Sequence, residues 1–254
     1  MNLILHKYLY PWLDAIALLA WGSLLLKYAL TGQLKLLIHP NYFGLVLASS
    51  ILLLILGIIA AILILINRKK KTEINQHITL FPPGFSSSLL LIVAIAGLII
   101  PPKVLTSQTA MQRENGDIPL TNSQPQAFRT TTKPESRSLI DWIRTINAYP
   151  EPDAYQGQAA KISGFVLYKN ELPDNYLVLS RFVITCCAID AYPIGLPVKL
   201  ETSRNNYPLD TWLEIKGKMI TETFSETTET KRSLVLAAES LTQIPTPSDP
   251  YNYK

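Results

Sequence analysis

One stretch of this 254-residue chain limits its possible folds more than any other: residues 43 to 66 run for 24 positions without a charged side chain. A helix of that length rises about 36 Å, which exceeds the roughly 30 Å hydrocarbon core of a bilayer. The run therefore predicts a membrane-spanning helix. We expect an integral protein of the cell membrane, with the lipid bilayer as one of its partners.

Two further apolar segments flank this run. The first carries Asp14 and Lys27 near its ends, where charged side chains can reach the headgroups. The last is short for a span, and an interfacial or re-entrant piece is the alternative. Spanning is favoured because "SSLLLIVAIAGLII" offers no polar face on which to lie flat. Gly57 and Ala61 make a spacing of small residues that lets another helix approach closely. We predict a membrane domain over residues 1–105 with three transmembrane helices, at about 12–31, 43–66 and 85–101.

Four adjacent cations, residues 68 to 71, set the predicted orientation. The positive-inside rule keeps this loop in the cytoplasm. With three spans the amino terminus is then also cytoplasmic, and everything after Pro101 is extracytoplasmic. The sequence thus predicts a multi-pass protein with a large polar domain outside the cell membrane.

The charges are divided unevenly between the two halves of the chain. Of the 23 Lys and Arg residues seven precede Pro101, and of the 19 Asp and Glu residues only two do. The polar half is therefore close to neutral, whereas a nucleic-acid-binding domain needs surplus cations on the face that meets phosphates. We expect no nucleic-acid partner.

The polar half begins with residues 106–137, rich in Ser, Thr, Gln, Asn and Pro, which we interpret as a flexible linker. Ser138 and Asp141 then have capping-box spacing before one short amphipathic helix. Strands are predicted at 159–168, 176–187, 197–201, 211–220 and 233–240.

Two of these strands contain a glycine, Gly164 and Gly217, and an interior glycine commonly marks a bend or bulge. Five short strands with such glycines and one packing helix predict an all-β, OB-like small barrel over residues 138–245, followed by a tail at 246–254. A small open sandwich is the competing fold.

Both cysteines of the chain are adjacent, in the stretch "RFVITCCAIDAYPIG" at residues 181 to 195. Side chains alternate between the two faces of a strand, so Cys186 shares a face with Phe182 and Ile184, and Cys187 does not. We expect Cys186 to face the core and Cys187 to be the more accessible, provided that no bulge intervenes.

Three interpretations of the pair stay open. Soft thiolates favour Cu(I) or Zn, and Asp190 could add an oxygen ligand. An oxidising compartment favours a vicinal disulfide instead. Such a bridge is strained, because consecutive Cα atoms lie about 3.8 Å apart and ordinary bridges need about 4.4–6.8 Å. In the third interpretation the two small residues only fill the core.

Other candidate site residues are few. The predicted topology places His39 on the same outer side as the cysteines, so His39 is a candidate additional metal ligand, or faces a partner's site together with the pair. Arg181 is a candidate binding residue, although a rim charge or an ion-pair partner of Asp190 would explain it as well. The polar half contains no histidine, no glycine-rich phosphate loop and no Gly-x-Ser-x-Gly motif. We expect no hydrolase, NTPase or other enzyme, while redox chemistry of the cysteines stays open.

The order of these parts, with "IHP" before the second span and "GFVLYKNELPDNYLVLSRFVITCCAIDAYPIGLPV" at residues 164 to 198, resembles the YcgQ-like family of proposed permease subunits. The resemblance covers essentially the whole chain and is most specific around Arg181 and the cysteine pair. It implies an accessory, non-catalytic subunit that works with a larger multi-spanning permease, and it supplies no substrate. The alternatives are a membrane-anchored thiol, redox or metal-binding protein that acts without a permease, and an envelope module that binds a polymer.

Overall fold

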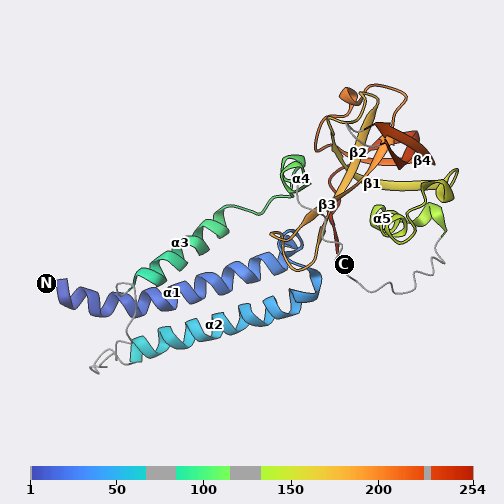
Figure 1. Ribbon diagram of the computed structural model, residues 1–254. Coiled ribbons are helices and arrows are strands. Elements are labelled where there is room, and N and C mark those ends of the chain that lie inside the picture. Colours follow the sequence, from blue (N-terminus) through green and yellow to red (C-terminus); the bar gives the residue numbers. More distant parts are fainter. Residues whose placement is uncertain (1, 67–83, 115–132, 226–229, 254) are drawn as a thin grey trace. The chain divides into compact units, whose positions relative to one another are not determined.

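The computed structural model describes residues 2–66, 84–114, 133–225 and 230–253, which fall into two compact units, Met1–Lys103 and Val104–Lys254 (Figure 1). The cations at 68–71 lie outside the described residues, as does most of the predicted linker. The two units are described separately below.

The first unit is helical, and its three main helices are α1 (Asn2–Leu30), α2 (Phe43–Ile66) and α3 (Phe85–Ile99). Figure 1 shows α2 and α3 each lying alongside α1. Among the described residues, two helical stretches are long and apolar enough to cross a membrane, Leu9–Leu30 and Pro40–Ile66. With 15 residues α3 is equally apolar in character but shorter.

Small residues let α1 and α2 approach closely. A Cβ atom added at Gly57 would lie 2.8 Å from the Leu19 side chain of α1, and one added at Gly22 would lie 2.8 Å from Leu54 of α2. The residue further along α1, Gly22, faces the residue less far along α2, Leu54, so the two helices run antiparallel. Gly57 thus accommodates a neighbouring helix, as its sequence context predicts, and that helix belongs to the same chain.

Polar side chains of α1 bond to α3 from its first turn to its last. Successive pairs advance in the same direction along both helices, so α1 and α3 run parallel. The cation at the end of α1 also lies at the carbonyl end of α3, where the helix dipole favours positive charge. The pairs are Ser87 with Asp14, the Trp21 indole with the Leu90 carbonyl at 3.0 Å, the Lys27 ammonium with the Leu98 carbonyl at 2.7 Å, and the Tyr28 hydroxyl with the Gly97 carbonyl at 2.6 Å.

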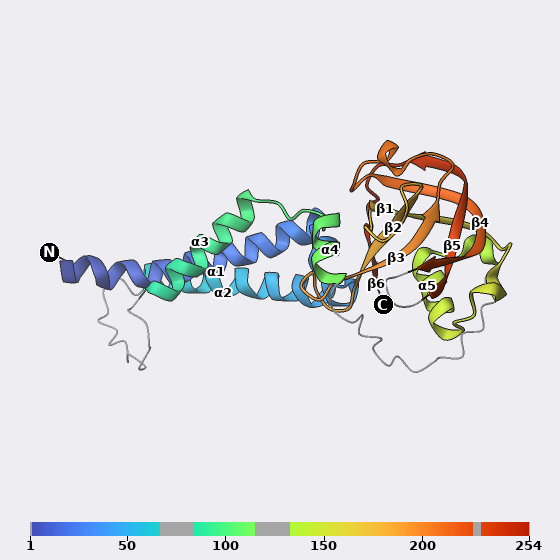
Figure 2. The same ribbon diagram turned by 45° about the horizontal axis from the view of Figure 1, so that its top comes forward.

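The second unit is a small closed β-barrel, as predicted (Figure 2). Five strands pair in the closed order β1-β4-β5-β3-β2, and β2 pairs again with β1. Only β3 and β5 run parallel within this ring, and β6 adds to β2 in parallel. The strands are β1 (Ala159–Leu167), β2 (Tyr176–Ile184), β3 (Tyr192–Lys199), β4 (Trp212–Ser225), β5 (Thr230–Gln243) and β6 (Tyr251–Tyr253).

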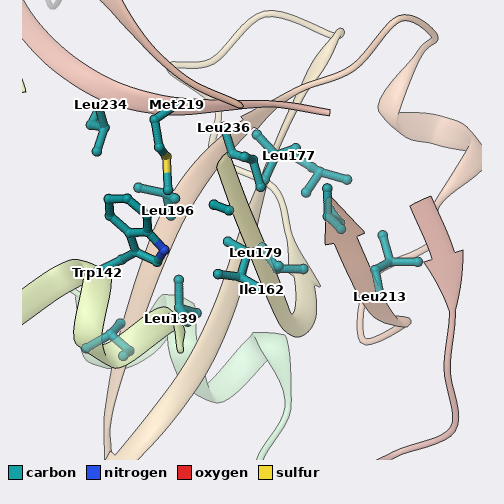
Figure 3. Close-up of a cluster of buried hydrophobic side chains, with 14 of the residues drawn as sticks. Leu139, Trp142, Ile162, Leu177, Leu179, Leu196, Leu213, Met219, Leu234 and Leu236 are labelled. Atoms are coloured by element: carbon teal, nitrogen blue, oxygen red, sulfur yellow. The ribbon is translucent and has the colours of Figure 1, made fainter. Parts of the chain in front are cut away.

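Helix α5 (Leu139–Ala148) packs on the barrel core. It begins at the predicted capping box, in which Ser138 and Asp141 bond to each other's backbone. Figure 3 shows Trp142 extending from α5 toward Met219, and both side chains are fully buried. The apolar stripe of the helix therefore fills the barrel interior and anchors the segment that precedes β1.

Gly217 lies at the predicted irregularity in β4. The register with β5 shifts between Lys216 and Gly217, and a Cβ atom at Gly217 would lie only 1.9 Å from the Ala237 carbonyl oxygen. The bulge lets the long β4–β5 pair bend around the barrel.

Several boundaries differ from the sequence prediction. Strand β3 begins at Tyr192, five residues earlier than expected. Its prolines, Pro193 and Pro197, are tolerated because this part of the strand pairs only with β2, and pairing with β5 starts at Val198. The predicted tail contains β6. The predicted linker contains the 8-residue helix α4 (Ser107–Glu114), which gains partners from the barrel that no local pattern reveals.

Candidate metal centre

The cysteine pair lies in a turn and not in a strand. Strand β2 ends at Ile184, and Asp190 then folds the chain back by accepting backbone N–H bonds from Thr185 at 3.3 Å, Cys186 at 2.7 Å and Cys187 at 3.3 Å. The Asp190 N–H bonds in turn to the Cys187 carbonyl at 3.0 Å. Successive N–H groups form a small anion-binding concavity, here filled by the chain's own carboxylate. We call residues 185–191 the cysteine turn.

The predicted orientation of the two cysteines is wrong. Cys186 is exposed and Cys187 is half-buried, the reverse of the order that strand alternation gives. The reason is that alternation stops at Ile184, where the ladder gives way to bonds from Asp190. The more exposed thiol is therefore the one beside the strand.

The three possible ligand groups of the turn lie close together. The Sγ atoms of Cys186 and Cys187 are 3.7 Å apart and not joined by a disulfide, and one ligand atom from each of Cys186, Cys187 and Asp190 lies within 4.8 Å of the other two. The carboxylate keeps acceptor capacity after its backbone bonds, since each oxygen has two lone pairs. The turn thus offers two sulfur ligands and one oxygen ligand to a single cation.

Without a bound cation, electrostatics at the turn hold a proton on the Cys186 thiol. Hydrogen bonding to the Asp190 carboxylate and to Cys187 raises the pKa of Cys186 to about 12. Desolvation raises the pKa of Asp190, but bonds from the Cys186 thiol and the backbone amides outweigh it, so that this pKa lies below its usual value. Two thiolates beside a carboxylate repel one another, and a bound cation would remove that repulsion.

The donor set fits a thiophilic ion. Zinc is tetrahedral and accepts Cys sulfur and Asp oxygen, and sites with three protein ligands keep a fourth position open. Cu(I) prefers thiolates and needs fewer ligands. In such a site Cys186 and Cys187 would hold the ion, Asp190 would add an oxygen, and the ion would make thiolates stable at neutral pH.

Two residues named from the sequence are not part of the cysteine turn. His39 belongs to the helical unit, is buried, and its Nδ1 atom accepts the Asn41 N–H at 3.1 Å, which caps the short helix η2 (Pro40–Tyr42). Its role as a ligand stays a prediction. The Arg181 guanidinium lies 5.3 Å from the Trp212 ring centroid and bonds to Ser163 at 3.3 Å. The Asp190 carboxylate bonds to the turn instead, and the role of Arg181 as a binding residue stays a prediction.

One residue of the site is not apparent from the sequence. Arg113 of α4 donates from Nη1 to the carbonyls of Ala188 at 3.1 Å and Ala191 at 2.5 Å, on the cysteine turn. It lies in a polar stretch that the composition marks as linker, and 75 residues separate it from Ala188. No local signal could have linked the two.

The chain is thus of the class in which helices able to cross a membrane are joined to a small closed β-barrel, here with an exposed cysteine turn. The chain belongs to the DUF1980 family: the model of the DUF1980 C-terminal domain matches residues 124–254, and that of the DUF1980 N-terminal domain matches residues 13–116. A comparison with curated proteins gave no match.

Proposed function

We propose that this protein is an accessory, non-catalytic subunit of a two-component membrane permease complex and that it handles a thiophilic metal ion, Zn or Cu(I), through Cys186 and Cys187. The observation that carries the proposal is the convergence of two thiols and the Asp190 carboxylate within 4.8 Å on an exposed turn. A structural zinc site closes all four positions with protein ligands. A site with three ligands at the surface suits an ion that arrives and leaves.

The partner is a larger multi-spanning permease, as the likeness to YcgQ-like subunits implies. Ile189 of the cysteine turn, two residues after Cys187, is 87% exposed. On a turn fixed by hydrogen bonds, this isoleucine offers an apolar side chain for contact with another subunit near the candidate ligands. Contact with the permease and transfer of the metal ion would then use the same few residues of the cysteine turn.

The chain crosses the cell membrane three times, with the amino terminus in the cytoplasm and the barrel outside. The parallel course of α1 and α3, with α2 antiparallel to α1, supports three spans, since successive spans alternate in direction. Each end of α3 also bonds to α1. The closed order of the five strands supports the OB-like assignment of the barrel.

A second candidate function is a membrane-anchored thiol or redox protein, or a metal-binding protein, that acts without a permease. The Sγ–Sγ distance of 3.7 Å favours the redox version, because the two sulfurs already lie in contact. A bridge between adjacent cysteines would be strained and easily reduced.

Native mass spectrometry of the full chain in detergent tests the proposal. The chain is prepared without oxygen, with and without reductant, and offered Zn²⁺ or Cu(I), beside the double variant Cys186→Ser/Cys187→Ser. A metal adduct that the variant lacks is expected. A reductant-sensitive mass loss of about two hydrogens without an adduct would favour the redox alternative.

A pull-down tests the complex. Purification from the native membrane is expected to recover a multi-spanning protein with the wild-type chain and much less with Ile189→Ser, while metal binding by Ile189→Ser is unchanged.

Labelling tests the orientation. In the cysteine-free chain, Glu201→Cys is expected to react with an impermeant maleimide in intact cells. Reaction only after permeabilisation would contradict the proposed orientation.

A further inference from the structure

Helix α4 is fixed to the barrel at its first residue. The Asp210 carboxylate accepts the Ser107 backbone N–H at 2.5 Å and the Ser107 hydroxyl at 3.1 Å. Asp210 itself has a left-handed backbone with φ of 65°, which aims its side chain from the loop before β4. Ser107 is buried, and Ala110 on the next turn is completely buried. The helix is therefore part of the barrel unit (Figure 2).

Just before α4, the chain is fixed a second time. The Leu105 N–H donates to the Tyr251 hydroxyl at 2.8 Å, and Tyr251 is buried against Phe182 of β2. Only residues 100–104 separate α3 from this contact. The segment that leaves the helical unit is thus bonded to the barrel almost at once.

At its other end α4 holds the cysteine turn. The Arg113 bonds to Ala188 and Ala191 fix the two carbonyls on either side of Ile189 and Asp190. Asp190 fixes the amides of the same turn from within. A carboxylate on the N–H groups and a guanidinium on the carbonyls are both charge-assisted contacts, which are stronger than neutral ones. The ligands therefore depend on two anchors, one of them outside the turn.

We propose that Arg113 is a positioning residue for the metal centre and that docking of α4 on the barrel is coupled to cation binding by the cysteine turn. This inference rests on the metal-binding part of the proposed function. Holding the turn in its ligand geometry removes conformational freedom that a loose turn would lose on binding. Because coupling is reciprocal, a bound ion would in turn stabilise the docked state of α4.

The expected size follows from the contacts that are lost. Arg113→Gln removes two charge-assisted bonds. These bonds affect metal affinity only to the extent that they order the turn, so we expect metal affinity to fall by about tenfold. Asp210→Gly removes the bonds to Ser107 and keeps the left-handed backbone favourable. It touches nothing in the cysteine turn, so any loss of affinity must pass through α4.

The test compares variants of the full chain in detergent by competition titration with Zn²⁺ or Cu(I). Arg113→Gln and Asp210→Gly are expected to bind about tenfold more weakly than wild type, and Arg113→Lys to bind with intermediate affinity. The control is Arg232→Gln, which breaks the exposed ion pair with Asp153, 2.7 Å long, away from α4. Its affinity is expected to equal that of wild type.

A second readout does not depend on metal. Arg113 and Asp190 hold the turn from outside and from within, so hydrogen exchange at residues 185–187 of the metal-free chain should be faster in Arg113→Gln than in wild type. Hydrogen exchange of residues 105–113 should slow in wild type when metal is added, and exchange in β4 and β5 checks that each variant remains folded.

The outcomes are distinguishable. If the wild-type chain binds neither ion, the metal part of the proposed function fails. If it binds and Arg113→Gln binds equally well with unchanged hydrogen exchange at residues 185–187, this inference fails and the proposed function stands. If Arg113→Gln weakens binding and Asp210→Gly does not, Arg113 acts locally and the coupling to α4 docking is overturned.

Discussion

Ile184 divides the barrel protein into two regions that are held by different forces. Before it, β2 is one of the five barrel strands β1–β5, which we call the wall. Its residues are almost all buried, and it pairs with strands on both sides. After it, the cysteine turn buries little and is held by side-chain bonds from Asp190 and Arg113. Such a division lets the site change without unfolding its support, the usual arrangement of functional loops on rigid scaffolds.

The largest effect should come from breaking the wall. In Gly217→Ala the added methyl group would meet the Ala237 carbonyl, and the bulge would have to shift, so we expect a loss of several kcal/mol in the free energy of unfolding. Urea unfolding of the purified chain, followed by hydrogen exchange in β4 and β5, measures it.

Gly157→Ala is the control for this substitution. Gly157 has a left-handed backbone, which Gly217 does not have, and open space around it, so its replacement should cost about 1–2 kcal/mol through backbone strain alone. A loss for Gly217→Ala no larger than the loss for Gly157→Ala would show that the bulge relieves the contact with the Ala237 carbonyl at little cost.

Asp190→Asn should alter the turn and spare the wall. The single amide oxygen can replace only one of the two carboxylate oxygens that accept backbone N–H bonds, and it carries no charge to hold the proton on Cys186. The pKa of Cys186 should fall from about 12 toward the ordinary thiol value of about 8.5, and alkylation near neutral pH should become at least about tenfold faster.

Iodoacetamide rates as a function of pH, in a Cys187→Ser background, measure the change. Asp174→Asn, which removes an exposed carboxylate near Arg204, serves as the control and should leave the rates unchanged. An unaltered Cys186 profile in Asp190→Asn would mean that burial or the neighbouring thiol, and not the carboxylate, sets the pKa.

The third effect is a gradual change of metal affinity with pH. Because the raised pKa keeps the Cys186 thiol protonated at neutral pH, metal must displace its proton. Affinity should therefore rise with pH, by about tenfold per pH unit for each proton released, throughout the range below that pKa. Chelator competition at a series of pH values tests this, and a flat profile would show that the ion does not bind through the Cys186 sulfur.

The same division decides how much the sequence reveals. The wall is predictable because apolar alternation marks β1, the first part of β2, β4 and β5, and because Ser138 and Asp141 form a local capping box. Each of these signals lies within a few residues of the structure that it indicates. The barrel and its packing helix follow from them.

The turn and its supports are not predictable in that way. Asp190 ends β2 early by bonding to the amides of the cysteines, which reverses their expected exposure. Ser107 and Arg113 bond to residues 103 and 75 positions further along the chain. The local sequence therefore predicts a linker where α4 forms. The sequence therefore supplies the candidate ligands Cys186 and Cys187 but not the contacts that arrange them.

Strand β6 has a practical consequence for protein engineering. Its last residue, Tyr253, pairs with Ile184, only two residues before Cys186. A polyhistidine tag fused to this strand would be anchored next to the thiols, would compete for the same soft ions, and could supply imidazole ligands that the native barrel lacks. Purification handles belong at the opposite terminus, or must be cleaved before any titration is interpreted.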